Sequence, residues 1–234
     1  MIAHFEPSTS FFAIASRRVA VFAAVLALTA LAAHRYGFLE TVAFIAVLAV
    51  VLALVGAALA LWIVGFRGVW YRGDRGAGSL VVGALVLALV LAPYGVAGFR
   101  AATAPALTDI STDLDDPPPM PIAESRRVLP MNLLVPPNAS DRAAQAQAYP
   151  EVTGHRYSMP TERVLVSVRA LVSARGWRLV NPVPDTDDGG DSLIEATATT
   201  PFLSLPVDIA IRIADEDSST YVDMRSASRY GPHD

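Results

Sequence analysis

The feature that most limits the fold of this chain is a pair of long uncharged stretches, residues 41–66 and residues 79–99. They contain 26 and 21 residues. The longer one forms a helix of about 39 Å, more than the roughly 30 Å hydrocarbon core of a bilayer, and the shorter one is long enough to cross that core. Aromatic residues and arginines follow the first stretch, which is typical of the lipid headgroup level. We therefore predict two transmembrane helices.

A shorter apolar stretch, residues 19–33, precedes these two. Its short core and the two arginines before it are also compatible with a cleavable signal peptide. Apolar neighbours can lengthen it while His34 and Arg35 reach toward the headgroups, so we expect a retained helix. The sequence thus predicts a membrane region over residues 1–100, with helices at about 19–39, 41–66 and 79–99.

The arginines that flank the apolar stretches predict their orientation. Five arginines lie before the first helix or between the second and third, whereas the other flanking segments contain only Arg35 and Arg100. Because arginine-rich segments stay in the cytoplasm, we expect a cytoplasmic amino terminus and a periplasmic segment after Arg100, in a bacterial inner (plasma) membrane. The apolar stretches contain no Asp, Glu, Lys or Arg, which argues against a channel or pump acting alone.

Charge is divided unevenly between the two halves of the chain. Residues 1–100 carry 7 arginines and 3 acidic residues, while residues 101–234 carry 11 arginines and 19 acidic residues, which gives net charges of +4 and −8. The acidic half lacks the basic surface that nucleic-acid phosphates require, so we expect no nucleic-acid partner. The chain has no cysteine, which excludes disulfides, zinc–thiolate sites and thiol catalysis.

Residues 101–148 are rich in proline, and their first part is rich in aspartate. Proline fixes φ and lacks an N–H donor, so an extended, irregular backbone is expected. Four aspartates, at positions 109, 113, 115 and 116, are of the type that binds hard cations. However, stiff prolines follow where a calcium loop needs a sharp turn. We predict an acidic, proline-rich linker over residues 101–148 and no metal site.

Residues 149–234 have the pattern of a small α+β domain. The spacing of apolar residues predicts one helix over residues 161–175, which ends at Gly176. Alternating residues predict strands over residues 152–157, 177–183, 193–200, 207–213 and 220–229. The acidic cluster at 185–191 lacks the later ligands of a calcium loop, so a hairpin turn is expected there. We predict a three-helix transmembrane region followed by a small antiparallel sheet packed on one helix.

Strand alternation predicts that charged side chains share the face of the sheet opposite the helix. This set consists of Arg178, Glu195, Asp208, Arg212, Asp223, Arg225 and Arg229. One interpretation is a solvated face with charge pairs between strands. The other is a docking surface whose arginine forks bind an anionic ligand or another envelope protein. We take these seven residues as the candidate binding surface.

The second half of the chain also carries several motifs of a known family. They are the Asp-Ile-Ser-Thr-Asp segment at 109–113, Gly176-Trp177, the Ile-Glu-Ala-Thr-Ala-Thr-Thr segment at 194–200 and the Arg-Ser-Ala-Ser-Arg segment at 225–229. Over about residues 108–234 the chain resembles the uncharacterised bacterial family called domain of unknown function 1499. Members are often secreted or tethered behind membrane helices. The resemblance therefore implies a tethered domain and carries no activity with it.

Motifs for a catalytic serine, a catalytic zinc and a phosphate-binding loop are all absent from the sequence. His155 and His233, the histidines of the second half, lack the partners that a metal site needs. Glu195 and Asp208 form a carboxylate pair suited to acid–base work, so a cell-envelope hydrolase is the alternative function. We expect instead a membrane-anchored periplasmic binding or interaction module without catalysis or cofactor. Its expected partners are the lipid bilayer and an envelope protein or anionic ligand.

Overall fold

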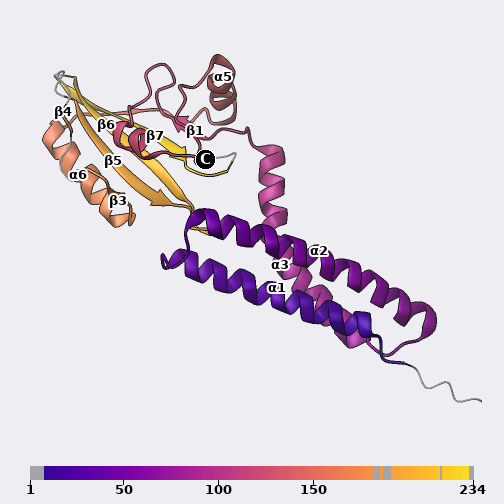
Figure 1. The fold of residues 1–234 in the computed structure, drawn as a ribbon. Helices are drawn as coiled ribbons and strands as arrows, with labels where there is room; N and C mark the ends of the chain where they lie inside the picture. Colours follow the sequence, from indigo (N-terminus) through magenta and orange to yellow (C-terminus); the bar gives the residue numbers. More distant parts are fainter. Residues whose placement is uncertain (1–7, 182–184, 187–190, 217, 232–234) are drawn as a thin grey trace, which may run out of the picture. The chain divides into compact units, whose positions relative to one another are not determined.

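The structure, a computed structural model, divides into two compact units, Met1–Arg100 and Ala101–Asp234. It describes residues 8–181, 185–186, 191–216 and 218–231. The first unit is helical, and the second combines helices with an antiparallel sheet (Figure 1). The predicted fold class, three apolar helices followed by a small antiparallel sheet, is confirmed.

The first unit consists of α1 (Phe11–Arg35), α2 (Thr41–Arg72) and α3 (Ala77–Thr103). All three are long and apolar enough to cross a membrane. α1 starts eight residues earlier than predicted and ends at Arg35 rather than near residue 39, whereas α2 continues six residues past its apolar part and α3 extends past both predicted limits. At the start of α1 the Ser10 hydroxyl accepts a hydrogen bond from the Ala13 N–H, and α2 ends at Gly73, whose φ of 71° is left-handed.

Small residues bring α1 and α2 into close contact. The Ser16 hydroxyl is buried and donates a hydrogen bond of 2.9 Å to the Ala58 carbonyl. A Cβ atom on Gly65 would lie 2.8 Å from the backbone nitrogen of Ala13. Since lipid tails are as apolar as the helices, such close backbone packing and hydrogen bonding are what hold membrane helices together.

The segment before α1 pairs with the loop between α2 and α3. The N–H of Arg75 donates to the Ser8 carbonyl, and the N–H of Ser10 donates to the Arg75 carbonyl, both at 2.8 Å. The Ser8 hydroxyl donates to the Asp74 carboxylate at 2.7 Å. These bonds place the two segments at the same end of the first unit.

The second unit is built on a sheet with the strand order β1-β7-β6-β5-β3, all neighbours antiparallel. β2 also pairs with β7, and β4 also pairs with β5. The strands are β1 (Asp109–Ser111), β2 (His155–Tyr157), β3 (Arg178–Leu179), β4 (Asp185–Thr186), β5 (Ser192–Thr199), β6 (Pro206–Glu216) and β7 (Ser219–Ser228). The helices of this unit are α4 (Pro121–Arg126), α5 (Ala139–Ala148) and α6 (Thr161–Ala174).

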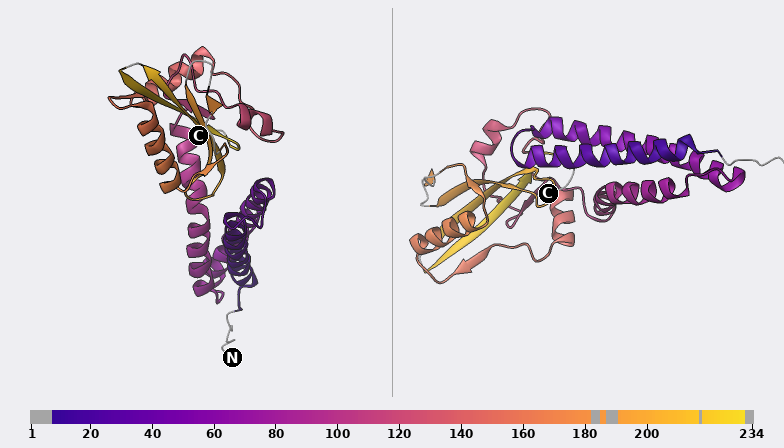
Figure 2. Two further views of the ribbon diagram at one scale, coloured as in Figure 1. Left: turned by 90° about the vertical axis from the view of Figure 1, so that its left-hand side faces the viewer. Right: turned by 90° about the horizontal axis from the view of Figure 1, so that it is seen from below.

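Helix α6 covers one face of this sheet (Figure 2). Val164 and Val172 of the helix are buried against alternate residues of β5 and β6, among them Ile194, Ile209 and Ile211. Alternation puts every second residue of a strand on the same face, so the intervening charged residues lie on the other face. The apolar pattern of the sequence therefore located the main core.

Residues 101–148 differ from the predicted linker, because they contain β1, α4 and α5 and belong to the second unit. Met120 and Ala123 are buried against Ala210 and Ala227, on the face of the sheet that α6 leaves uncovered. The prolines give part of this segment an extended course, as expected. Composition does not show, however, that Met120 and Ala123, which lie among these prolines, pack against Ala210 and Ala227 of the sheet.

The contact at Gly65 makes a specific prediction for the first unit. Gly65→Val should weaken the α1–α2 contact, because overpacking of this kind costs about 1–3 kcal/mol. Gly56→Val is the matched control, since a Cβ at Gly56 meets nothing within 4 Å. Thermal unfolding of the full chain in mild detergent should give a lower Tm for Gly65→Val alone. Equal Tm values for the two variants would contradict the close contact.

Candidate functional site

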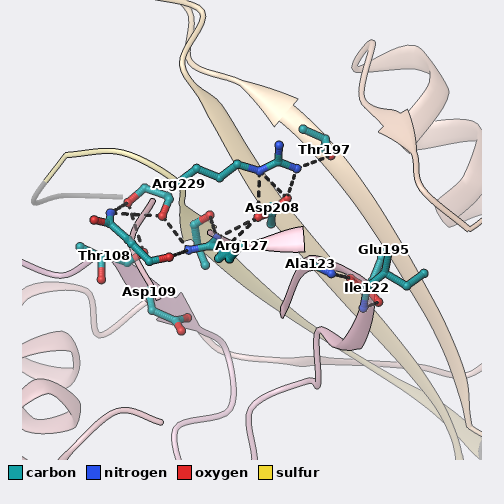
Figure 3. A network of polar contacts seen from close by, with 12 residues as sticks. Thr108, Asp109, Ile122, Ala123, Arg127, Glu195, Thr197, Asp208 and Arg229 are labelled. Atoms are coloured by element: carbon teal, nitrogen blue, oxygen red, sulfur yellow. Dashed lines mark hydrogen bonds and ion pairs between the residues drawn. The ribbon is translucent and has the colours of Figure 1, made fainter. Parts of the chain in front are cut away.

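Residues 108–137 begin with the edge strand β1 and then cross the charged face of the sheet. We call this segment the strap. Six of the seven candidate residues are on the strands and turn beneath it or beside it, and Figure 3 shows three of them, Glu195, Asp208 and Arg229. The sequence pattern predicted correctly that these residues share a face. It did not predict that the chain's own strap covers that face.

Asp208 accepts hydrogen bonds from two arginines at once. Its Oδ2 lies 2.9 Å from Nη2 of Arg127, and its Oδ1 lies 2.6 Å from Nη2 of Arg229. The side chains of Arg127 and Asp208 are only 3% and 4% exposed. Arg229, which directly follows β7, also donates a hydrogen bond to the Thr197 hydroxyl of β5.

Arg127 uses all five of its N–H donors (Figure 3). Two donate to Asp208. The other three donate to the backbone carbonyls of Asn132, Ala227 and Ser228, at 2.7 to 3.0 Å. A buried guanidinium is tolerated when its charge is paired and every donor is satisfied. Sequence analysis missed Arg127, because nothing in the sequence separates it from its exposed neighbour Arg126.

Glu195 of β5 holds the start of α4. Its two carboxylate oxygens accept the backbone N–H groups of Ile122 and Ala123 at 3.0 and 2.9 Å. The residue before α4, Met120, has no capping side chain, so a strand far away in sequence supplies the cap. Burial raises the pKa of Glu195, an effect that these two N–H groups oppose.

Arg225 of β7 fastens the first strand of the strap. Its guanidinium pairs with the Asp109 carboxylate at 2.6 Å and donates to the Pro118 carbonyl at 3.2 Å. Ser226 and Ser228 have the opposite strand parity to Arg225, so they lie on the other face of β7. Ser228 bonds strap residue Thr108 from its backbone N–H at 2.9 Å.

Arg212 of β6 fastens the aspartate-rich turn of the strap. It forms two hydrogen bonds with Asp223, which is 1% exposed, and a 2.6 Å ion pair with Asp116. Burial opposes the charge of Arg212, but these two carboxylates raise its pKa above the ordinary value. Burial also raises the pKa of Asp223, although Arg212 opposes this shift. Asp109 and Asp116, two of the four clustered aspartates, are thus strap anchors.

The remaining sequence candidates lie on the outer strands of the sheet. Arg178 is exposed on β3, at the other edge of the sheet, and His155 is exposed on β2. Most of the acidic turn at 185–191 and His233 lie outside the described residues. The structure therefore pairs six of the seven charged candidates with the strap or with one another, while Arg178, opposite Thr197 on the same face, is exposed.

Chemically, this arrangement fixes the strap to the sheet. Glu195, Asp208 and Asp223 are each at most 3% exposed, and each has its carboxylate oxygens engaged by strap or sheet donors. The guanidinium groups of Arg212, Arg225 and Arg229 are likewise paired with carboxylates. Both the arginine forks and the acids expected to bind a partner are therefore used inside the domain.

A hollow of about 420 Å³ lies at the edge of the strap. Its lining residues are Thr112, Asp113, Leu114, Gln145, Ala146, Tyr149, Pro150, Val152, Thr153 and Tyr221. The Tyr221 ring lies under the Arg156 guanidinium at 4.6 Å, and a Cβ on Gly154 would collide with the Tyr221 hydroxyl. Partial burial raises the pKa of Tyr221, and the charges of Asp223 and Asp113 add to this shift.

The two adjacent arginines allow a direct test of the strap network. Arg127→Met should lower the free energy of unfolding by about 3–5 kcal/mol, because it leaves buried acceptors without donors and removes one partner of Asp208. Arg126→Met, at an exposed position, should change it by less than about 0.5 kcal/mol. Urea-dependent pulse proteolysis of the full chain in detergent measures both values. If both variants unfold at the same urea concentration, the network does not hold the strap.

The comparisons with known proteins address the same part of the chain. Residues 109–234 match the family model described as "Protein of unknown function (DUF1499)". The match starts at β1, the first strand of the strap, and so includes the strap together with the sheet. No curated protein and no solved structure matches the chain. Since the match covers more than half of its length, the chain belongs to the DUF1499 family, with three helices apolar enough to cross a membrane before the family domain.

Proposed function

We propose that the chain is a membrane-anchored binding module that works without chemistry of its own. The observation that carries this proposal is the hollow at the edge of the strap, a concave surface that meets the internal charge network only at Asp113, which lies 3.9 Å from Arg212. Ligand sites of globular domains are typically concave and combine apolar walls with a few polar groups. The hollow has this composition, with Tyr149 and Tyr221 beside Asp113 and Thr153.

The lining of the hollow favours a cationic or neutral polar ligand. Among the described residues that line it, Asp113 is the only charged one. An aromatic ring and a carboxylate, here Tyr149 and Asp113, attract organic cations and also suit polar groups that donate hydrogen bonds, whereas the Tyr221 ring already carries the Arg156 guanidinium. The anionic ligand expected from the arginines has less support, since Arg212, Arg225 and Arg229 are paired inside the domain.

The alternative function, a cell-envelope hydrolase that uses Glu195 or Asp208, has weaker support. A general acid or base must reach the proton that it transfers. Glu195 is 2% exposed and Asp208 is 3% exposed, and both are covered by the strap. A hydrolase of this kind would need the strap to leave the sheet during each turnover.

We also propose that the binding domain is periplasmic, in an inner-membrane protein with a cytoplasmic amino terminus. The support is the arginine distribution, since five arginines flank the apolar stretches on the side of the amino terminus: Arg17 and Arg18 in the first part of α1, Arg67 and Arg72 in the last part of α2, and Arg75 in the loop after it. The pairing of Ser8 and Ser10 with Arg75 is in keeping with this topology, because it brings the segment before α1 and the loop after α2 to one end of the first unit.

Reporter fusions test this orientation. An enzyme that is active only in the periplasm should be active when fused after Ala106 and inactive when fused after Gly76, because an odd number of helices separates the amino terminus from the domain. Fusion of a cytoplasm-dependent fluorescent protein at the same two positions should give the reverse result. The opposite pattern in both assays would invert the topology.

Ligand-induced thermal stabilisation of the full chain in detergent tests the hollow. A panel of amino acids, diamines, quaternary ammonium compounds, neutral sugars, phosphate and dicarboxylates is suitable. We expect the Tm to rise with a cationic or neutral compound and not with the anions. The rise should disappear in Thr153→Trp, which fills the hollow, and weaken in Asp113→Asn, which keeps the acceptor for the Asp115 and Asp116 N–H groups.

Arg178→Ala is the matched control for these variants, because Arg178 is exposed at the far edge of the sheet. It should respond to the ligand as the unmodified chain does. Stabilisation that persists in Thr153→Trp, or that is caused by the anions alone, would contradict binding in the hollow.

A further inference from the structure

A run of exposed apolar side chains projects from the strap. Val128, Leu129, Leu133 and Val135 are 62%, 84%, 59% and 65% exposed. Single exposed apolar residues are common on protein surfaces, but four within eight residues form a patch of the kind that marks an interaction surface. We call residues 128–135 the apolar loop.

The apolar loop is held in place by polar contacts on both sides of its tip. Arg127, which precedes it, is the buried centre of the strap network. In its middle, the Asn132 backbone N–H donates a 2.9 Å hydrogen bond to the Arg229 carbonyl, and the Asn132 side-chain amide donates to the Gly231 carbonyl at 2.8 Å. Leu134 packs inward toward Ala210 and Ala227. The four exposed side chains are therefore presented by a fixed backbone.

The apolar loop lies beside the point where the chain enters the domain. The Ser228 carbonyl accepts hydrogen bonds from Arg127 and Asn132, and the Ser228 N–H donates to the Thr108 carbonyl. Helix α3 ends at Thr103, so five residue steps separate it from Thr108. Even fully extended, five steps span no more than about 18 Å. The length of the chain therefore limits the distance between Thr108, to which the loop is joined through Ser228, and the last residue of α3 to about 18 Å.

The charge around the apolar loop suits a lipid surface. Between Glu124 and Asp141 the chain has no acidic residue, although residues 101–234 as a whole have a net charge of −8, and of the two arginines in this stretch Arg126 is exposed while Arg127 is paired with Asp208. Apolar side chains flanked by basic ones bind the boundary between headgroups and acyl chains, where the arginine attracts anionic lipids. Exposed Arg126 occupies this flanking position.

We propose that the apolar loop is a second membrane contact, in which Val128, Leu129, Leu133 and Val135 enter the headgroup region of the bilayer that the three helices cross. A short tether makes this contact intramolecular, so a small number of inserted side chains suffices to keep the domain on the surface. The contact fixes one face of the domain against the lipid. It does not depend on which side of the membrane the domain occupies, nor on the ligand of the hollow.

Because the chain has no cysteine, single-cysteine variants can be labelled without background. Leu129→Cys and Leu133→Cys place an environment-sensitive fluorophore on the apolar loop. Val166→Cys is the matched control, since Val166 is 67% exposed on α6, which covers the opposite face of the sheet. Each full-length variant is placed singly in nanodiscs of phosphatidylcholine and phosphatidylglycerol, with nitroxide-bearing lipid or aqueous iodide as quencher.

We expect lipid nitroxide to quench labels at 129 and 133 at least roughly two-fold more than the label at 166, and iodide to quench them less. Adding Leu133→Asp to the labelled Leu129→Cys chain should restore iodide quenching at 129, whereas adding Val166→Asp should not. Equal accessibility at all three positions overturns the proposal. So does a blue-shifted label at 129 that lipid nitroxide does not quench, which would indicate a protein surface as the occupant.

Discussion

The ion pair between Arg127 and Asp208 joins the two parts of the second unit, the sheet and the strap that covers it. Burying both charges is costly, and the cost is offset only because all five guanidinium donors and both carboxylate oxygens are engaged. Glu195, Arg212 and Arg225 repeat the arrangement with Ala123, Asp116 and Asp109 as strap partners. The charged face of the sheet is thereby buried, which explains how the strap stays on the sheet although several of its apolar side chains are exposed.

The sequence could predict which residues are charged and share a face, but it could not predict that the strap pairs with them. Uncharged length predicted three helices apolar enough to cross a membrane, and alternation predicted both the α6 core and the set of charged residues opposite it, because these patterns are local. The cover of the charged face depends on contacts such as Asp109 to Arg225, which are 116 residues apart. Likewise, Arg126 and Arg127 are neighbours of the same type, and only the folded backbone decides that one is buried and the other exposed.

The internal pairing also changes which surfaces are free to act. With the arginines of β6 and β7 engaged, the surfaces that remain available near the strap are the hollow beside Tyr221 and the apolar loop. One lies near α5 and the turn after β1, and the other lies next to Thr108, so they occupy different parts of the same segment. The strap contributes Thr112, Asp113 and Leu114 to the first surface and Val128, Leu129, Leu133 and Val135 to the second.

The strap precedes nearly every strand in the sequence, whereas most of its anchors are on β6 and β7, the last two strands. Arg127 and Ser228 are 101 residues apart, and Thr112 and Met224 are 112 apart. Contacts of such long sequence separation slow folding, since a large loop must close before any of them forms. The strap therefore leaves the ribosome, and crosses any membrane, before its partners exist. The strap aspartates that pair with Arg212 and Arg225 cannot form these ion pairs until β6 and β7 have been synthesised. The order of synthesis therefore makes the domain fold late and as a whole.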